Sequence, residues 1–172
     1  MADGMLYMGS MEGEVLAINP SSRSAQFSFP QESEGEWSFS FGGGGQGSFL
    51  SCAPAVQVSF YGSPVVVDGV VYIGTGTGKI FALNATAGYD IWEYPRDGYI
   101  GSIVGSPVID NGILYVGSSD GNLYAIDIET RRLAWDSPFA TGDDIWATPL
   151  VQDGVVYFGS LDHKFYALDA ET

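Results

Sequence analysis

Residues 63–84 read SPVVVDGVVYIGTGTGKIFALN, and the pattern of this stretch recurs along the chain. Six residues after the Asp of its Asp-Gly pair comes the glycine of a Gly-Ser/Thr pair, and eight residues later comes an alanine. The pattern occurs four times: Asp3-Gly4, Gly9 and Ala17; Asp68-Gly69, Gly74 and Ala82; Asn111-Gly112, Gly117 and Ala125; Asp153-Gly154, Gly159 and Ala167. Repeats of roughly 40 to 50 residues are typical of solenoids and propellers.

The segments between these markers predict β-strands. They are short, rich in β-branched and aromatic residues, and bounded by Gly, Asp and Asn. An Asp-Gly or Asn-Gly pair favours a two-residue hairpin turn, so each unit is expected to be an antiparallel meander. In the second unit we expect strands at about 61–67, 70–75, 79–84 and 89–94. No stretch has a sustained helical apolar stripe.

The inner strands are apolar on both faces, as residues 70–73 and 123–126 illustrate. Both faces must then be covered, and small sheets packed face to face around an axis achieve this. The repeated alanine indicates a position where the neighbouring sheet leaves no room for a larger side chain. We therefore predict an all-β fold, a β-propeller of about four blades, each a four-stranded antiparallel meander.

The repeat unit is about 42 residues long and has further markers. Pro64, Pro107 and Pro149 each precede an Asp/Asn-Gly pair by four residues, and Phe27, Trp92 and Trp135 each follow an alanine by ten. These predict one propeller segment, 1–172, with repeats at about 1–30, 54–95, 97–138 and 140–172 and an insertion at about 31–53. The first unit lacks the Ser-Pro strand and the fourth lacks the Trp strand, so each is expected to have three strands.

The pattern Ala-x-Asp/Asn-x7-Trp, present from Ala82 to Trp92 and from Ala125 to Trp135, resembles the tryptophan-docking motif of the pyrroloquinoline-quinone (PQQ)-like propeller repeat. That family includes quinoprotein dehydrogenases and the propeller lipoprotein of the bacterial outer-membrane β-barrel assembly machinery. The resemblance implies that Trp92 and Trp135 pack onto the adjacent blade, with Phe27 as a weaker substitute. It also implies a ring of seven or eight blades and an extracytoplasmic location.

One turn departs from the pattern. The second unit has Gly88 in the turn before its tryptophan, whereas the first and third units have Arg23 and Arg131 there. These differences are typical of diverged natural repeats.

Composition excludes several classes of partner. The chain has 21 acidic and 6 basic residues and a formal net charge of -15, so phosphate backbones and anionic membranes would repel it. No apolar run is long enough for a membrane span, and the N-terminus lacks the apolar core of a signal peptide. Cys52 is the single cysteine, which excludes an internal disulfide framework.

The insertion at 31–53 has an acidic start, then Trp37, Phe39 and Phe41, then the glycine-rich run 42–47, which we expect to be mobile. Two interpretations are open. It is either a protruding recognition loop with the aromatic residues as anchors, or a hairpin packed on the rim.

Four motifs resemble functional sites but have simpler explanations. Residues 74–79 resemble a phosphate-binding loop, yet they lead into a strand and their glycines recur in other repeats. His163 occupies a turn, and no second histidine exists. Asp143-Asp144 beside Trp146 is expected to be a solvated loop between blades instead of a calcium site. Asn84-Ala85-Thr86 matches a glycosylation sequon, but other repeats have Asn19, Asp127 or Asp169 there, which indicates turn chemistry.

We therefore assign no catalytic, cofactor-binding or metal-binding residue and expect no cofactor. The sequence favours a non-catalytic scaffold or protein-binding module with a protein or peptide partner, its further blades coming from additional sequence or self-association. The alternative is a fragment of a PQQ-dependent quinoprotein dehydrogenase. By family analogy such an enzyme needs a full ring, calcium, a catalytic Asp and commonly paired cysteines.

Overall fold

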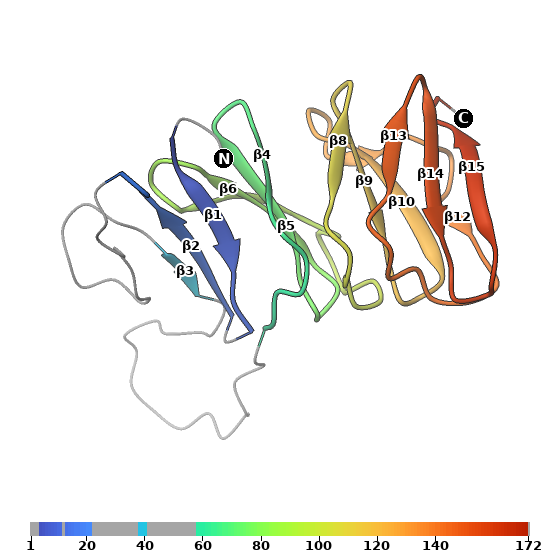
Figure 1. The fold of residues 1–172 in the computed structure, drawn as a ribbon, viewed down its shortest axis with the longest axis horizontal. Helices are drawn as coiled ribbons and strands as arrows, with labels where there is room; N and C mark the ends of the chain where they lie inside the picture. Colours follow the sequence, from blue (N-terminus) through green and yellow to red (C-terminus); the bar gives the residue numbers. More distant parts are fainter. Residues whose placement is uncertain (1–3, 12, 22–37, 41–57, 172) are drawn as a thin grey trace.

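The computed structural model describes residues 4–11, 13–21, 38–40 and 58–171, and these form β-strands without a helix. The strands group into four antiparallel sheets that follow one another along the chain (Figure 1). We call them blades 1 to 4. None of the described residues forms a helix that is long and apolar enough to cross a membrane.

Blades 1 and 2 come from the N-terminal half. Blade 1 has the order β1-β2-β3, with β1 (Leu6–Gly9), β2 (Glu14–Ile18) and β3 (Ser38–Ser40). Blade 2 has the order β4-β5-β6-β7, with β4 (Val65–Val67), β5 (Val70–Gly74), β6 (Ile80–Asn84) and β7 (Asp90–Tyr94). The four strands expected for the second unit are confirmed, the first of them shorter at its N-terminal end.

Blades 3 and 4 follow the same plan. Blade 3 contains β8 (Val108–Asp110), β9 (Ile113–Gly117), β10 (Asn122–Asp127), β11 (Arg132–Leu133) and β12 (Phe139–Ala140). Its outer edge is divided, because β11 pairs with one end of β10 and β12 with the other. Blade 4 has β13 (Leu150–Gln152), β14 (Val155–Gly159) and β15 (Phe165–Asp169) in that order. Within the described residues, blades 1 and 4 each have three strands, as expected.

The recurring Asp/Asn-Gly pairs form the hairpin turns that the sequence predicts. Asp68, Asn111 and Asp153 have φ of 49°, 47° and 53°, and the glycine after each has φ between 74° and 78°. Two successive positive φ values match the right-handed twist of the flanking strands. The pairs therefore connect the first two strands of blades 2, 3 and 4.

The first blade differs from the sequence prediction in one respect. Its outer strand β3 lies within the segment 31–53 that we assigned to an insertion, and Val15 pairs with Phe39 as Ile80 pairs with Tyr94 in blade 2. Extra residues between β2 and β3 move the outer strand along the sequence without changing its place in the sheet. Phe27, Cys52 and the glycine-rich run lie outside the described residues.

The hydrophobic core lies between the blades. Residues on one face of blade 2, including Val71 and Ile73, form a cluster with Val15 of blade 1. The other face of blade 2 packs against blade 3, and the opposite face of blade 3 packs against blade 4. Both faces of each inner blade are thus buried, which explains why their strands are apolar throughout.

Candidate interaction surfaces

Two tryptophans lie in the clusters between blades. The Trp135 side chain is 8% exposed, its ring centroid lies 5.9 Å from that of Tyr115, and its Nε1 donates a 3.1 Å hydrogen bond to the carbonyl of Ala170 in blade 4. Trp92 is equally buried, 5.8 Å from Tyr72, within the cluster shared with blade 3. Each indole therefore joins its own blade to the next.

In each of the first three blades, the strand that follows the Asp/Asn-Gly pair ends in a glycine. The connection to the next blade covers this glycine. A Cβ atom added at Gly9, Gly74 or Gly117 would overlap the side chain of Phe60, Ile103 or Ile145, respectively. Each covering residue comes eight positions before the next Asp/Asn-Gly pair. This spacing is a signal in the sequence that identifies the covering residue.

Gly159 of blade 4 has no such cover, because an added Cβ would meet nothing within 4 Å. Next to it on the same face, Phe165 is 74% exposed and stacks on Tyr157 at a centroid distance of 6.3 Å. The corresponding residue of blade 3, Leu123, is fully buried. We call Tyr157, Gly159, Phe165 and Ala167 the end face of blade 4.

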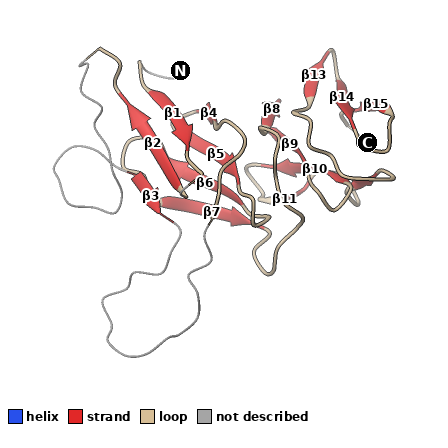
Figure 2. Cartoon of the chain, turned by 60° about the horizontal axis from the view of Figure 1, so that its bottom comes forward, coloured by secondary structure: helices blue, strands red, loops and turns tan. Residues whose placement is uncertain are grey.

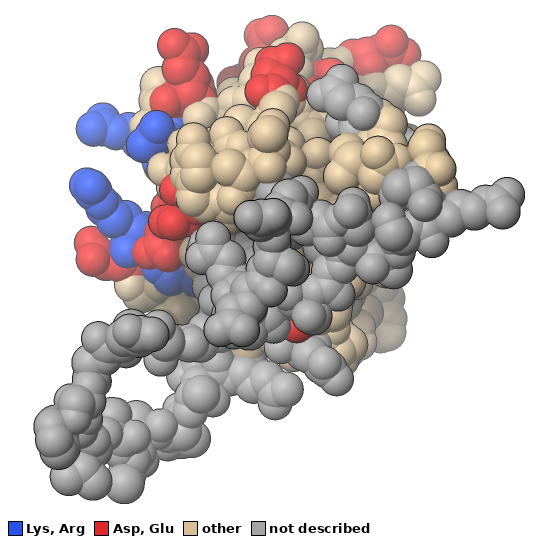
Figure 3. Space-filling model, turned by 90° about the vertical axis from the view of Figure 1, so that its left-hand side faces the viewer, with Lys and Arg blue, Asp and Glu red and all other residues tan. Residues whose placement is uncertain are grey.

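Blade 1 has an exposed apolar face at the other end of the arc. Leu6 and Met8 are 40% and 43% exposed, whereas Val71 and Ile73, their equivalents in blade 2, are fully buried. Figure 3 views the molecule from this end. We call Leu6, Met8, Leu16 and Ile18 the end face of blade 1.

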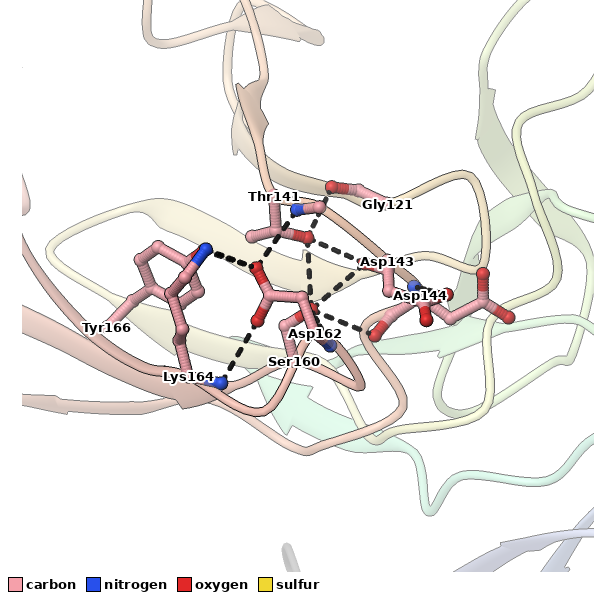
Figure 4. Close-up of polar contacts among 9 residues, drawn as sticks. Gly121, Thr141, Asp143, Asp144, Ser160, Asp162, Lys164 and Tyr166 are labelled. Atoms are coloured by element: carbon pink, nitrogen blue, oxygen red, sulfur yellow. Dashed lines mark hydrogen bonds and ion pairs between the residues drawn. The ribbon is translucent and has the colours of Figure 1, made fainter.

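A carboxylate clasp holds the connection between blades 3 and 4 (Figure 4). Asp162 Oδ2 accepts hydrogen bonds from the Tyr166 hydroxyl at 2.6 Å, the Gly142 backbone N–H at 3.0 Å and Lys164 Nζ at 3.3 Å. The bond from Tyr166 is the main reason that the pKa of Asp162 falls well below its ordinary value. The carboxylate therefore stays ionised and acts as an anchor for the connection.

Asp120 forms the same clasp one blade earlier. Its Oδ2 accepts from the Tyr124 hydroxyl at 2.7 Å and from the Gly101 backbone N–H at 3.3 Å. Partial burial acts to raise the pKa of Asp120, but these hydrogen bonds outweigh it and lower the pKa. Burial, followed by the bond to Asp120, raises the pKa of Tyr124. The spacing Asp-x3-Tyr in the third and fourth repeats was a further signal in the sequence.

The loop with Asp143 and Asp144 connects blades 3 and 4, and Asp143 is exposed. Ser160 Oγ donates to the Asp143 carbonyl at 3.0 Å, and Thr141 Oγ1 donates to the Gly121 carbonyl at 2.9 Å (Figure 4). Trp146 Nε1 donates to Asp144 Oδ2 at 3.1 Å on the surface. The polar atoms of this loop hold blade 4 against blade 3.

The other motifs that resembled sites are turns. Gly78 and His163 occupy equivalent positions between two strands, with φ of 82° and 68°. Asn84 Oδ1 accepts from the backbone N–H groups of Thr86 and Ala87 at 3.0 and 2.8 Å, and Asp127, Asp169 and Asn19 accept comparable bonds. These residues thus close turns, as the sequence indicated.

Lys79 is a buried charge that the sequence did not predict. Its Nζ lies 2.9 Å from Glu93 Oε1, donates to the Pro95 carbonyl at 2.6 Å, and stands 5.4 Å from the Tyr99 ring centroid. A buried ammonium needs such partners to offset its lost hydration. Lys79 therefore ties the outer strand β7 to β6.

The dehydrogenase alternative implies a calcium ion held by protein side chains. In the parts of the chain that the structure describes, no three His, Cys, Asp or Glu side chains come together as possible metal ligands. The carboxylates of Asp120, Asp127 and Asp162 instead accept hydrogen bonds from their own turns and clasps.

Comparisons with known proteins agree with this architecture. The family profile described as "Outer membrane protein assembly factor BamB" matches residues 1–172. BamB from Moraxella catarrhalis superimposes with a TM-score of 0.68 at 20% identity, over 97% of this chain and 43% of that one. The computationally designed Ika4 protein superimposes with a TM-score of 0.66 at 15% identity, over 98% of this chain and 87% of that one. No curated protein sequence matches the chain.

An enzyme is also among the similar structures. Quinohemoprotein alcohol dehydrogenase ADHIIG from Pseudomonas putida HK5 is 30% identical, with a TM-score of 0.55 over 64% of this chain and 19% of that one. This chain thus spans less than half of either natural relative. The match over all 172 residues shows that the chain belongs to the BamB family of PQQ-like β-propeller repeat proteins.

Proposed function

We propose that this chain is a non-catalytic propeller segment that acts as a protein-binding scaffold in an extracytoplasmic compartment. The observation that carries the proposal is the end face of blade 4. Its residues occupy positions that are buried between blades elsewhere in the molecule, yet Phe165 is 74% exposed. An apolar sheet face of this kind favours contact with another polypeptide surface.

The other end of the arc supports the same function. The end face of blade 1 carries Leu6 and Met8 at the positions of Val71 and Ile73, which face blade 1 in the described interface. The two end faces are therefore equivalent to the two faces that meet wherever neighbouring blades pack inside this chain. Further blades, from additional sequence or from a second copy, are the natural occupants. The BamB likeness favours an envelope location.

A fragment of a quinoprotein dehydrogenase is the second candidate. It is favoured by the 30% identity with the alcohol dehydrogenase. The aspartates of the repeats argue against it, since Asp120 and Asp162 are engaged in clasps between elements of the fold.

Two measurements test the proposal. Sedimentation velocity over a range of concentrations should show association for the wild type, loss of association for Phe165→Asp, and no loss for Tyr99→Asp, a control at an exposed residue outside the end faces. Titration with PQQ and Ca²⁺, followed by absorbance, should show no stoichiometric complex. A monomeric wild type that binds the quinone stoichiometrically would contradict the scaffold and support the enzyme.

A further inference from the structure

A groove lies on the outer rim between blades 2 and 3. The edge strand β7 lines one side and residues 130–132 of blade 3 line the other, enclosing about 640 Å³. Figure 2 shows β7 and β11 next to each other along one edge of the molecule. This rim groove is separate from both end faces and from the clasps.

The charge of the rim groove is opposite to that of the whole protein. The chain has six Lys and Arg residues against 21 acidic residues, and three of the six, Arg96, Arg131 and Arg132, line this groove. Figure 3 shows Lys and Arg side chains along one side of the molecule, with Asp and Glu side chains beside them. Of the two carboxylates in the lining, Glu93 is paired with Lys79 at 2.9 Å. The groove is therefore a locally basic site on an acidic protein.

The three guanidinium groups are available to a ligand. All three arginines are exposed, and the ion pairs among the described residues are Lys79–Glu93 and Lys164–Asp162. A guanidinium group presents a planar fork of donors that matches a carboxylate. Trp92 and Ile91 add apolar surface to the same lining.

The backbone conformation of the turn does not explain why residue 131 is an arginine. Arg131 has φ of 61°, and its N–H donates to the Asp127 carbonyl at 2.8 Å. Gly88 makes the equivalent turn in blade 2, with φ of 73° and a 2.8 Å bond to the Asn84 carbonyl. Glycine adopts positive φ without the steric cost that a Cβ incurs. The turn itself therefore gains nothing from arginine.

We propose that the rim groove binds an extended acidic peptide segment of a protein partner, whose carboxylates pair with Arg96, Arg131 and Arg132. The inference rests on the proposed function only in that the ligand is a protein. Because the groove and the end faces share no residue, the proposal for the groove can be wrong while the proposal for the end faces is right, and the reverse.

The test is fluorescence anisotropy with a fluorescein-labelled peptide of four Glu-Ser repeats. Arg131→Gly keeps the turn and removes the side chain, so its melting temperature should equal or exceed that of the wild type while its affinity falls about tenfold. Lys164→Ser removes one positive charge from blade 4 and should bind within about twofold of the wild type. A peptide of four Lys-Ser repeats should not bind.

Several outcomes would overturn the inference: no binding of the Glu-Ser probe to the wild type, equal binding by Arg131→Gly, or an equal loss in Lys164→Ser. Displacement of the probe by inorganic phosphate as readily as by unlabelled peptide would indicate a general anion site and would also overturn it. The sedimentation and quinone measurements on the same variants report on the scaffold alone, so the two failures are distinguishable.

Discussion

Blades 3 and 4 carry the same pattern of residues in opposite environments. In blade 3, Gly117 is covered by Ile145, and Leu123 is fully buried. In blade 4, the equivalent Gly159 meets nothing within 4 Å, and the equivalent Phe165 is 74% exposed. The first three strands of blade 3 correspond to the three strands of blade 4.

The comparison shows that the repeat encodes an interface as well as a sheet. A blade can form its hairpins with local turns alone. Its apolar faces, however, are buried only when a neighbouring blade supplies the covering residue. Stability in repeat proteins of this kind comes from individual repeats and from the contacts between neighbours. Variants at equivalent positions in the two environments can therefore separate the two contributions.

The largest expected effect is at the buried tryptophan. Trp135→Ala should lower the free energy of unfolding by about 3 to 5 kcal/mol, because it removes a large buried ring and leaves a cavity between blades 3 and 4. Trp146→Ala is the control, since that side chain is 51% exposed and should cost about 0.5 kcal/mol or less. Denaturant unfolding measures both. Similar losses for the two variants would mean that the blade interface contributes little.

The glycine pair gives the next contrast. Gly117→Ala should destabilise the protein by about 1 to 3 kcal/mol, since the added methyl group overlaps Ile145. Gly159→Ala adds the same methyl group to the open end face and should change stability by about 0.5 kcal/mol or less. Thermal and urea unfolding of the two variants check this. Equal losses of stability in the two variants would show that the strand geometry requires glycine, and that the contact with Ile145 does not.

The clasp of blade 3 predicts a dependence on pH. Tyr124→Phe should cost about 1 to 2 kcal/mol at pH 7, because Asp120 loses a hydrogen bond to its charged form. The pKa of Asp120 is lowered in the fold, so this contribution is present above the ordinary Asp pKa and is lost as pH falls through the native pKa. The pKa of Tyr124 is raised, so the contribution is also lost as pH rises through the native value of that hydroxyl.

Unfolding of wild type and Tyr124→Phe from acidic to neutral pH measures this effect. The gap between the two stability curves should narrow as pH falls below about 4. A gap that stays constant down to low pH would mean that the hydroxyl stabilises the fold by packing and not through the carboxylate.

The smallest effect on stability is expected at the end face of blade 4. Phe165→Ser should change the unfolding free energy of the monomer by about 0.5 kcal/mol or less, because the ring is already in water. It should nevertheless weaken association in sedimentation experiments. A large loss of monomer stability would show that the stacking on Tyr157 holds β14 and β15 together.

Much of the fold was predictable because it rests on local rules. The turn at Asp68-Gly69 needs positive φ, and its sequence alone favours that geometry. Ala82 and Ala125 are fully buried, as the recurring alanine indicated, and Ala167 is exposed since its blade has no further neighbour in the structure. His163 and Asn84 are turn residues for the same local reasons.

The first repeat was harder to predict because strand pairing is not local. Spacing pointed to Phe27 as the aromatic residue of the outer strand, and Phe27 lies outside the described residues. Instead, Val15 pairs with Phe39 as Ile80 pairs with Tyr94, so Phe39 takes the position of Tyr94. In the sequence, Trp37 comes two residues before Phe39, just as Trp92 comes two residues before Tyr94. Counting residues cannot locate extra residues that fall between paired strands.

The meanders, their turns and the class of repeat follow from the sequence, because they depend on hydrophobic periodicity and on residues that tolerate positive φ. The packing of the blades, and not the sequence pattern, shows which glycines are covered, which carboxylates hold connections, and that Arg96, Arg131 and Arg132 line one groove. Arg96 and Arg131 lie in different repeats, and it is the packing of blades 2 and 3 that brings them together.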